Sequence, residues 1–453
     1  MKSKIDSTVD LFKKKGPQIA FIAVMDLTVL GSDDLRWLLY KDLISIPVLV
    51  RNLIAIKQNG VQEILLQYSS NQFEVRRILE DHPLIGSFLS WYELNPGESM
   101  NPDFLKRMEK NGCCWIHPHY LMNGIFLTGF MEALQGNSDS PREIIKNQIS
   151  KDSVLWLSKP YIQNLISENG SSFKEHLRSD SKEEVIIEDP EVEGQEVRSL
   201  SDVGKAEKII CRDITRKKGG PIAKILNEPI SLWIAKQCAK TNIQPNTITV
   251  LNTLLGLFSA FLVVWGGFKD LYWPIALGGL LFYLADIFDG IDGELARFTF
   301  RLHKHGALYD TLSDNSILLA IFAASTYAAY QDYPHPFVIY LGISMVAMFV
   351  GLVLYLLLFC LRHFKNASLR FYEARFVPLL PRKDFLIQII LFMKVFYTKD
   401  IFAALITFAL VINQPILILF VTNGLLILMF TAFIYMGFRY GHLIEKEKSL
   451  FST

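Results

Sequence analysis

The sequence has few cysteines, and none of them has the spacing of a disulfide framework or a zinc site. Five cysteines occur among 453 residues, no CxxC pair is present, and the count is odd. Small disulfide-stabilised domains and structural zinc sites rely on paired, regularly spaced cysteines. We therefore exclude both scaffold classes and expect reduced thiols in a protein that faces the cytosol.

The first half of the chain also lacks long apolar runs, and we find no signal peptide. Three lysines at 13–15 precede a short apolar stretch, Ile19–Met25, which leads directly into Asp26. The stretch is too short for the apolar core of a secretory signal. We interpret it as the first buried β-strand of a soluble domain.

Strand-like and helix-like segments alternate through this half. Three apolar runs are typical of buried strands: Ile19–Met25, Glu63–Tyr68 and Cys113–His117. Three segments have apolar residues at helical spacing: Ile46–Gln58, Asn71–Asp81 and Ile125–Leu134. The first of these helices stops at an Asn-Gly pair, and the second opens on an asparagine, both of which are common cap signals. This alternation predicts a soluble α/β, Rossmann-like domain over residues 1–170.

The region that follows changes in charge. The acidic stretch Glu183–Glu196 indicates a solvated linker over residues 171–204. Residues 205–245 begin with basic side chains and continue into an amphipathic helix, Leu226–Ala239, that carries Trp233. We expect this helix to lie on an anionic membrane surface. The alternative is an ordinary surface helix of the soluble domain.

The second half of the chain is dominated by apolar runs. A membrane-spanning helix needs about 20 apolar residues, and six segments approach that length: Thr247–Gly267, Leu271–Arg297, Gly306–Tyr330, Phe337–Leu361, Phe385–Leu410 and Pro415–Phe438. They predict a six-helix membrane domain over residues 246–440, followed by a short tail over residues 441–453.

Basic residues are unevenly distributed among the loops of this half. They gather between the second and third spans, between the fourth and fifth spans, and in the tail. Positively charged loops stay on the cytosolic side. We therefore expect an integral protein of the cell membrane whose soluble domain, two termini and active site all face the cytosol.

Four carboxylates occupy adjoining ends of the second and third predicted spans. Asp289 and Asp292 are three residues apart, and Asp310 and Asp314 are four apart, so each pair shares one helix face. Carboxylates inside spans are costly and are therefore functional candidates. Their mutual repulsion calls for cations, and oxygen ligands without cysteine or histidine favour Mg²⁺ or Mn²⁺, with two ions expected.

Three further residues near these acids are suited to a phosphate-containing ligand. Gly293 and Ala296 have little side-chain bulk, and Arg297 offers a bidentate phosphate contact. A cation-coupled transporter is the alternative for acids between spans. That alternative lacks the internal repeats and broken helices usual for transporters.

The segment from Asp289 to Asp314 resembles the signature of the CDP-alcohol phosphotransferases. It reads D-x-x-D-G-x-x-A-R-x8-G-x3-D-x3-D without exception. The resemblance covers the membrane half from about Pro229 to the C-terminus. It implies transfer of a substituted phosphate from a CDP-linked donor to an alcohol, with release of CMP.

The same resemblance implies roles for individual residues. Asp289, Asp292 and Asp310 fall on metal-ligand positions, and Asp314 falls on the position that contacts metal and deprotonates the attacking hydroxyl. The nucleotide-binding positions are occupied by Asn246, Thr249, Gly293, Ala296 and Arg297.

Two nearby residues lie outside this pattern. Asp286 is extra to the motif, and we expect it to support the ligands indirectly. His303 stands where some relatives have a small hydroxyl residue near the donor phosphates.

The motif does not choose between substrates. The donor is either a CDP-diacylglycerol or a CDP-polyol, and the acceptor is an unspecified alcohol. The resemblance also implies a homodimer in contact with membrane lipids, and we expect no nucleic-acid partner. The metabolic setting that we expect is phospholipid biosynthesis or polyol-phosphodiester biosynthesis.

The order of the two halves resembles the bifunctional cytidylyltransferase–phosphotransferases that make inositol phosphodiesters. The segment that contains Arg51 and Asn52 is similar to a sugar-nucleotidyltransferase motif. The glycine-rich loop expected after the first strand is missing, and Asp33 and Asp34 stand there instead. Because such a loop cradles the triphosphate, we expect a degenerate domain that serves as a platform, with a second active site as the alternative.

His117 and His119 offer two possible metal ligands near the end of the third predicted strand. Two histidines without a third ligand are weak evidence for a metal, so we expect ordinary polar packing.

Overall fold

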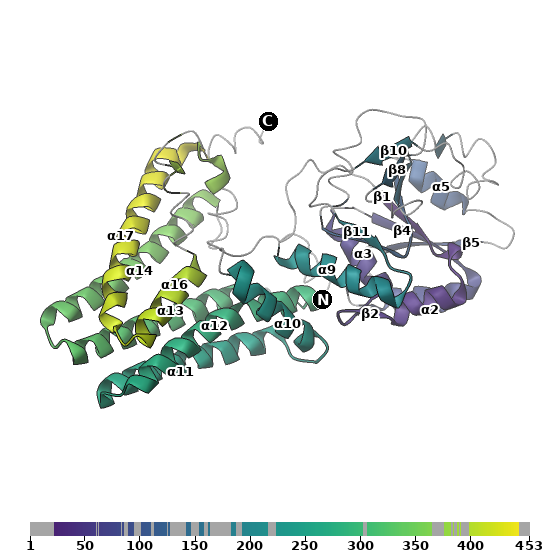
Figure 1. The fold of residues 1–453 in the computed structure, drawn as a ribbon. Helices are drawn as coiled ribbons and strands as arrows, with labels where there is room; N and C mark the ends of the chain where they lie inside the picture. The colour runs from purple at the N-terminus through teal and green to yellow at the C-terminus, as the bar shows by residue number, and fades with distance from the viewer. Residues whose placement is uncertain are drawn as a thin grey trace. The chain divides into compact units, whose positions relative to one another are not determined.

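A computed structural model gives the fold of the chain, and Figure 1 shows its ribbon. Apart from short gaps, it describes residues 22–59, 61–82, 84–94, 101–126, 142–145, 154–157, 162–163, 183–186, 193–215, 223–301, 306–364 and 376–443.

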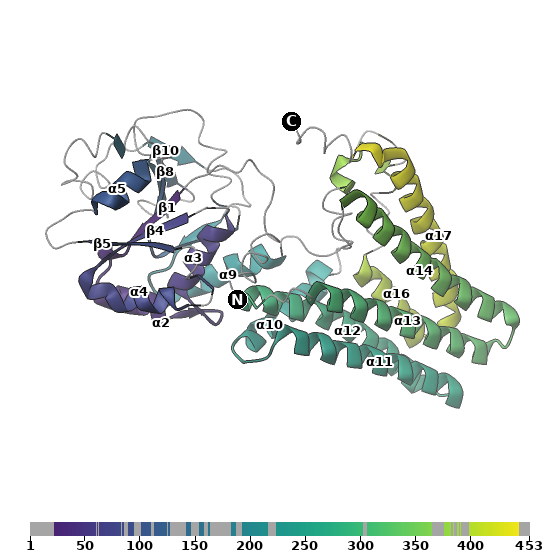
Figure 2. The ribbon, with the colours of Figure 1, turned by 180° about the vertical axis from the view of Figure 1, so that it is seen from behind.

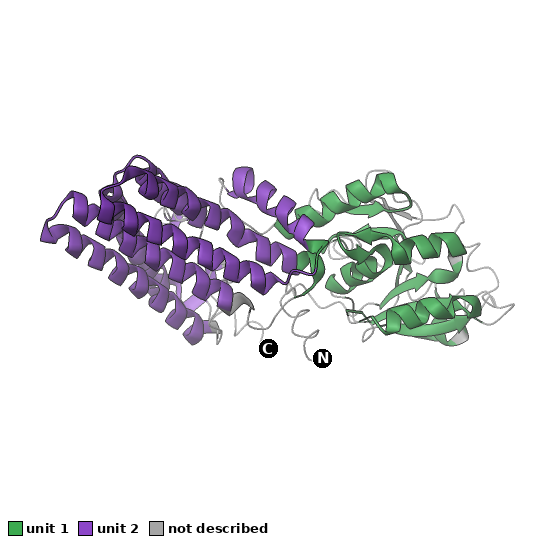
Figure 3. Ribbon diagram, turned by 90° about the horizontal axis from the view of Figure 1, so that it is seen from below, with its two compact units in different colours: residues 1–216, 239–241, 297–304 green, residues 217–238, 242–296, 305–453 purple. Residues whose placement is uncertain are grey.

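The chain divides into two compact units, coloured separately in Figure 3. The first contains residues 1–216, 239–241 and 297–304, and the second contains residues 217–238, 242–296 and 305–453. An N-terminal α/β unit and a helical C-terminal unit agree with the fold class expected from the sequence.

The first unit is built on a seven-stranded sheet of order β10-β8-β9-β6-β1-β4-β5. Its strands are β1 Ile22–Asp26, β4 Glu63–Ser69, β5 Leu89–Leu94, β6 Cys113–Ile116, β8 Arg142–Ile145, β9 Val154–Leu157 and β10 Glu183–Ile186. All run parallel except β9, which is antiparallel to both of its neighbours. The central strands are therefore parallel, as in the α/β domain expected from the alternation of strands and helices.

The order of strands reverses at β1, because β4 lies on one side of it and β6 on the other. In open α/β sheets the crevice at the carboxyl ends of such strands is the usual ligand site. Every residue of β1 is buried, which explains why this strand reads as a continuous apolar run ending in an aspartate. That aspartate, Asp26, therefore stands at the edge where a ligand site is expected.

The described helices of this unit are α2 Ser32–Tyr40, α3 Val48–Gln58, α4 Phe73–Glu80, α5 Pro102–Glu109 and α9 Leu200–Thr215. Two small sheets complete it, one formed by β2 Asp42–Leu43 and β3 Ile46–Pro47, the other by β7 Tyr120–Met122 and β11 Gly194–Glu196. The helix expected at Ile46–Gln58 is present as α3. Most of the helix expected at Ile125–Leu134 lies outside the described residues.

The starts of two helices in this unit can be compared with the sequence. The segment around Asp33 and Asp34 is the first turn of α2, where acidic side chains complement the helix dipole. The start of α4 is capped differently from the asparagine cap expected. A short 3₁₀ turn precedes the helix, and Ser69 and Gln72 form a capping box there.

The acidic stretch also differs from the solvated linker expected of it. Residues Glu183–Ile186 form β10, which pairs with β8, and Gly194–Glu196 form β11, which pairs with β7. Glutamates at the border of a sheet are compatible with strand pairing because a charged edge strand discourages further association. A high content of acidic residues was therefore not enough to identify a solvated linker.

The second unit consists of helices. They are α10 Glu228–Ala239, preceded by a π-helical turn at Ala223–Asn227, then α11 Pro245–Lys269, α12 Tyr272–Thr299, α13 Gly306–Asp332, α14 Pro336–Phe364, α16 Lys399–Val411 and α17 Pro415–Tyr440. In the two ribbon views α14 runs beside α17 (Figures 1 and 2). The helices of this unit share an apolar core, which includes the fully buried Ile321 and Phe322 of α13 and Met345 of α14.

Four described helices are long and apolar enough to cross a membrane: Pro245–Lys269, Tyr272–Thr299, Pro336–His363 and Pro415–Tyr440. The third predicted span corresponds to α13, whose first turns carry Asp310, Asp314 and Asn315. The fifth predicted span differs more. Its described helix α16 begins at Lys399 rather than Phe385, and residues 391–397 lie outside the described residues.

Candidate active site

Three of the four motif aspartates converge. Asp289 on α12 and Asp310 and Asp314 on α13 each place one carboxylate oxygen within 4.8 Å of the others. All three side chains are half-buried. The one-turn spacing of Asp310 and Asp314 on α13 aims both carboxylates at α12. The residues that the sequence pattern grouped are therefore close enough to share a cation.

Asp292 makes a different contact. Its Oδ2 accepts a short hydrogen bond from the Thr249 hydroxyl, which joins α12 to the first turns of α11. Nearby, the Thr253 and Ser313 hydroxyls lie 2.5 Å apart and join α11 to α13. The helix that carries the nucleotide-binding candidates is thus tied to both helices that carry the acids.

The other candidate residues occupy neighbouring turns. Asn246 lies half-buried in the first turn of α11, which begins at Pro245. Gly293, Ala296 and Arg297 follow Asp292 along α12, with Ala296 buried and the other two half-buried.

A lysine that the sequence analysis did not identify contacts the acids. Lys399 Nζ lies 2.9 Å from Asp289 Oδ2 and 2.8 Å from Asp314 Oδ1. The fifth span predicted at Phe385–Leu410 contained Lys399 and Asp400. Ionisable residues within a span are functional candidates, so this signal was available in the sequence.

Three further acids near the cluster are held by the segment Ala223–Ser231. Asp286 Oδ2 accepts a hydrogen bond from Asn227 Nδ2 at 3.0 Å. Glu294, which is fully buried, accepts one from the Ser231 hydroxyl at 3.0 Å. Asp400 accepts one from the backbone N–H of Ala223 at 2.9 Å. The expectation that Asp286 supports the site indirectly agrees with this contact.

The donor set of the cluster fits a divalent metal. It consists of carboxylate oxygens, the ligands that Mg²⁺ and Mn²⁺ prefer. The oxygens of Asp289, Asp310 and Asp314 are mutually close enough to bind one ion, and Asp292 lies one turn beyond Asp289 on the same helix.

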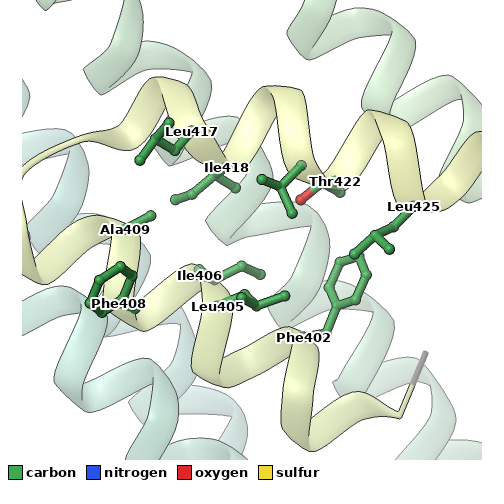
Figure 4. Close-up of a pocket in the computed structure, with 10 residues that line it drawn as sticks. Phe402, Leu405, Ile406, Phe408, Ala409, Leu417, Ile418, Thr422 and Leu425 are labelled. Atoms are coloured by element: carbon green, nitrogen blue, oxygen red, sulfur yellow. The ribbon is translucent and has the colours of Figure 1, made fainter. Parts of the chain in front are cut away.

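An apolar cavity of about 190 Å³ lies between α16 and α17. Figure 4 shows Phe402, Leu405 and Ile406 of α16 facing Ile418 and Leu425 of α17. The cavity has no charged side chain among its lining residues, so it offers shape and apolar contact rather than chemistry.

At the crevice edge of the first unit, the loop after β1 is held by internal hydrogen bonds. The buried Asp26 accepts hydrogen bonds from the Thr28 backbone N–H at 2.9 Å and from the Thr28 hydroxyl at 2.7 Å. Gln72 donates to the Leu27 carbonyl at 2.9 Å, and Leu30 N–H donates to the same carbonyl at 3.1 Å. The loop after β1 therefore satisfies its own backbone groups with an internal carboxylate.

Arg51 and Asn52, which carry part of the nucleotidyltransferase resemblance, are buried and structural in this chain. Arg51 donates to the carbonyls of Leu43 and Ile44 at 2.9 and 3.1 Å, and burial lowers its pKa to about 10. Asn52 donates to the Pro118 carbonyl at 2.7 Å. Both side chains fix turns of the domain.

His117 and His119 stack with ring centroids 5.2 Å apart. The His119 backbone N–H donates to His117 Nδ1 at 3.3 Å. Burial, with Arg198 nearby, lowers the pKa of His119. These contacts are those of a packed turn, in agreement with the polar packing expected.

Comparison with known proteins identifies the class of the helical unit. Residues 242–435 match the family model described as CDP-alcohol phosphatidyltransferase. The family model and the sequence motif therefore agree, and the resemblance found in the motif is confirmed for this part of the chain. The family acts on CDP-linked donors and alcohol acceptors and generally uses a divalent metal.

Several curated relatives share a single name, "Bifunctional IPC transferase and DIPP synthase". The protein from Aquifex aeolicus is 35% identical over 28% of this chain and 28% of its own length. The one from Thermococcus kodakarensis is 29% identical over 30% of each chain, and the one from Archaeoglobus fulgidus is 30% identical over 28% of this chain and 25% of its own. The matches thus span less than a third of these relatives.

A solved structure titled "Crystal structure of HddC from Yersinia pseudotuberculosis" aligns with 42% of this chain and 98% of its own. The identity is 12% and the TM-score is 0.31, which is too low to support an argument about fold or function.

Proposed function

We propose that this protein transfers a substituted phosphate from a CDP-linked donor to an alcohol and releases CMP. The observation that carries the proposal is the convergence of Asp289, Asp310 and Asp314 within 4.8 Å, inside a domain that matches the CDP-alcohol phosphatidyltransferase family.

The carboxylates have two roles in this proposal. Asp289, Asp292 and Asp310 bind Mg²⁺ or Mn²⁺, and a pair of such ions would neutralise the donor's diphosphate and orient it. Asp314 accepts the proton of the acceptor hydroxyl while the hydroxyl oxygen forms a bond to the transferred phosphorus. The bond from that phosphorus to the CMP oxygen breaks, and CMP leaves with the electron pair.

We assign donor binding to the turns that follow the acids. Gly293 and Ala296 leave room for the nucleotide beside α12, and Arg297 is suited to the diphosphate. Asn246 and Thr249 stand in the first turns of α11. Support for this assignment comes from the hydrogen bond between Thr249 and Asp292, which links the two groups of residues.

For the donor, we favour a CDP-polyol over CDP-diacylglycerol. The support is the name shared by the curated relatives, "Bifunctional IPC transferase and DIPP synthase", together with the order of the two halves of the chain. A polyol phosphodiester is then the product, and phospholipid biosynthesis is the less favoured setting.

We also propose the setting of the domain. Six segments span the cell membrane: α11 to α14, the predicted span Phe385–Leu410 that contains most of α16, and α17. Helix α10 lies at the cytosolic surface, and the acids face the cytosol. The soluble domain comprises residues 1–170, the connecting regions residues 171–204 and 205–245, the membrane domain residues 246–440 and the tail residues 441–453. A homodimer is the proposed assembly.

A second candidate function is a bifunctional enzyme whose N-terminal domain makes the CDP-linked donor. The relatives' name favours it, as does the reversal of strand order at β1. The internal contact between Asp26 and Thr28 opposes it, because it uses a backbone N–H that a triphosphate would require. We therefore propose a platform role for this domain and treat the second activity as an open test.

The transfer reaction can be tested with the purified full chain. CMP release is followed with CDP-inositol, CDP-glycerol and CDP-diacylglycerol, each offered inositol phosphate or glycerol phosphate. We expect release with a CDP-polyol, loss of release in excess EDTA, and recovery when Mg²⁺ or Mn²⁺ is added. Full activity in EDTA would contradict the metal-dependent mechanism, and no CMP release from any donor would favour the transporter alternative.

A further inference from the structure

Lys399 makes two close charged contacts with the acid cluster. It is the first residue of α16, and its ammonium bridges carboxylates on two other helices, Asp289 of α12 and Asp314 of α13, at 2.9 and 2.8 Å. The lysine side chain is 39% exposed, and each carboxylate side chain is 25% exposed. Water therefore weakens these ion pairs without removing them.

The position of Lys399 is fixed by the packing of α16 against α12. The Thr407 hydroxyl donates to the Gly279 carbonyl at 2.9 Å. A Cβ added at Gly279 would lie 2.8 Å from Leu410 Cβ, so the two helices approach at this point more closely than a larger residue would permit. This contact fixes the position of α16 along α12, and therefore where the Lys399 side chain begins relative to the acids.

The location is unfavourable for a lysine unless the acids are present. Lys399 lies in the first helical turn, where the helix dipole favours anions and opposes cations. Three ionised carboxylates with oxygens within 4.8 Å of one another repel, because solvent screens like charges only in part at this separation. The lysine charge offsets this repulsion.

We propose that Lys399 is an internal counterion of the metal site. Its ammonium holds Asp289 and Asp314 together while no divalent cation is bound, and it leaves these oxygens when one binds. The proposal rests on the metal-binding role given to the acids above. The side chain can move in this way because its four-carbon stem is flexible and its charge makes no fixed bidentate geometry.

The proposal has two consequences that differ from those of an ordinary structural ion pair. Without a lysine charge, the metal-free protein loses stability because the carboxylates repel. The same change raises metal affinity, because a divalent cation no longer competes with the ammonium. Added metal should then restore the stability that the substitution removed.

The test compares the full-length wild type with Lys399→Met and Lys399→Arg in detergent. Thermal unfolding is measured in EDTA and in Mn²⁺, and Mn²⁺ binding is measured by calorimetry without nucleotide. We expect Lys399→Met to unfold at lower temperature in EDTA, to recover in Mn²⁺, and to bind Mn²⁺ on the order of tenfold more tightly. Lys399→Arg should stay close to the wild type in both measurements.

Lys269→Met is the matched control, since Lys269 lies in the last turn of α11 over the Phe268 ring. It should change neither quantity. Unchanged Mn²⁺ affinity in Lys399→Met would overturn the counterion role, as would an unfolding temperature that stays low in Mn²⁺. Tight Mn²⁺ binding by a wild type that releases no CMP would leave this role intact and remove the transfer reaction instead.

Discussion

At the scale of single residues, Asp289 and Asp314 contact the same ammonium but are expected to contribute differently to catalysis. We predict that Asp314→Asn lowers the turnover of CMP release by about 10²- to 10⁴-fold, the range typical of a positioned general base. Its donor affinity should largely survive. Asp289→Asn should weaken both metal and donor binding, because it removes a ligand that Asp314→Asn leaves in place.

The two variants are separated by measuring KM for the donor, turnover and Mn²⁺ affinity in parallel. An equal loss of donor affinity in both would make Asp314 chiefly a metal ligand. Both substitutions keep the side-chain size and replace one carboxylate oxygen by an amide NH₂, so a difference between the two variants reports on the role of each position.

The aspartates could be predicted from the sequence because their signal is local. Asp310 and Asp314 share a helix face by spacing alone, and an apolar surrounding makes each carboxylate conspicuous. Lys399 stood out as an ionisable residue in a predicted span, but its contact with Asp314 could not be predicted, because that contact joins positions 85 residues apart. That contact depends on how α16 packs on α12, and no spacing rule expresses it.

At the scale of elements, the segment Ala223–Ser231 holds the helix that bears the acids. We predict that Ser231→Ala lowers the thermal midpoint of unfolding, because the buried Glu294 loses a hydrogen-bond donor. The expected loss in the free energy of unfolding is about 1–3 kcal/mol. CMP turnover should fall too, since Glu294 lies two residues beyond Asp292. A Cβ at Gly290 would lie 3.3 Å from the Ser231 hydroxyl, which shows how closely α10 and α12 pack.

Ser316→Ala serves as the control for this prediction. Ser316 is exposed on α13, and its hydroxyl donates to the Leu312 carbonyl of its own helix at 2.7 Å. Its removal should change unfolding little. If both serine variants unfold alike, the contact with Glu294 contributes nothing specific, and α10 is held by its apolar face.

Elements with strong periodicity were predictable, and those set by pairing were not. β1 and α3 carry their own signal, because β1 is an apolar run and α3 ends at a cap. By contrast, β10 and β11 are acidic, and they are strands only because β8 and β7 offer partners. The segment after β1 lacks the glycine-rich loop of the nucleotidyltransferases, and Asp33 and Asp34 stabilise a helix start there.

At the scale of the whole molecule, composition alone divided the chain into a soluble half and an apolar half, and the two units follow that division approximately. Composition could not predict that short segments such as residues 297–304 belong to the first unit. Those segments group by contacts in the folded chain, whereas composition is averaged over long windows. The motif likewise indicated the reaction class but carried no information about what the N-terminal unit does.

The last prediction concerns that unit, and it can be tested without separating the halves. A nucleotidyltransferase must bind a triphosphate with backbone N–H groups and a basic side chain. In this chain the Thr28 N–H is bonded to Asp26, the Leu30 N–H is bonded to the Leu27 carbonyl, and the buried Arg51 is engaged by carbonyls. The buried carboxylate of Asp26 also repels an incoming phosphate.

We therefore expect no pyrophosphate release when the full chain carrying Asp314→Asn is given CTP, Mg²⁺ and a panel of polyol phosphates. The substitution is used because this variant cannot efficiently consume any CDP-linked product. An active cytidylyltransferase assayed alongside validates the panel. Pyrophosphate release that depends on one polyol phosphate would establish the bifunctional alternative and identify the donor at the same time.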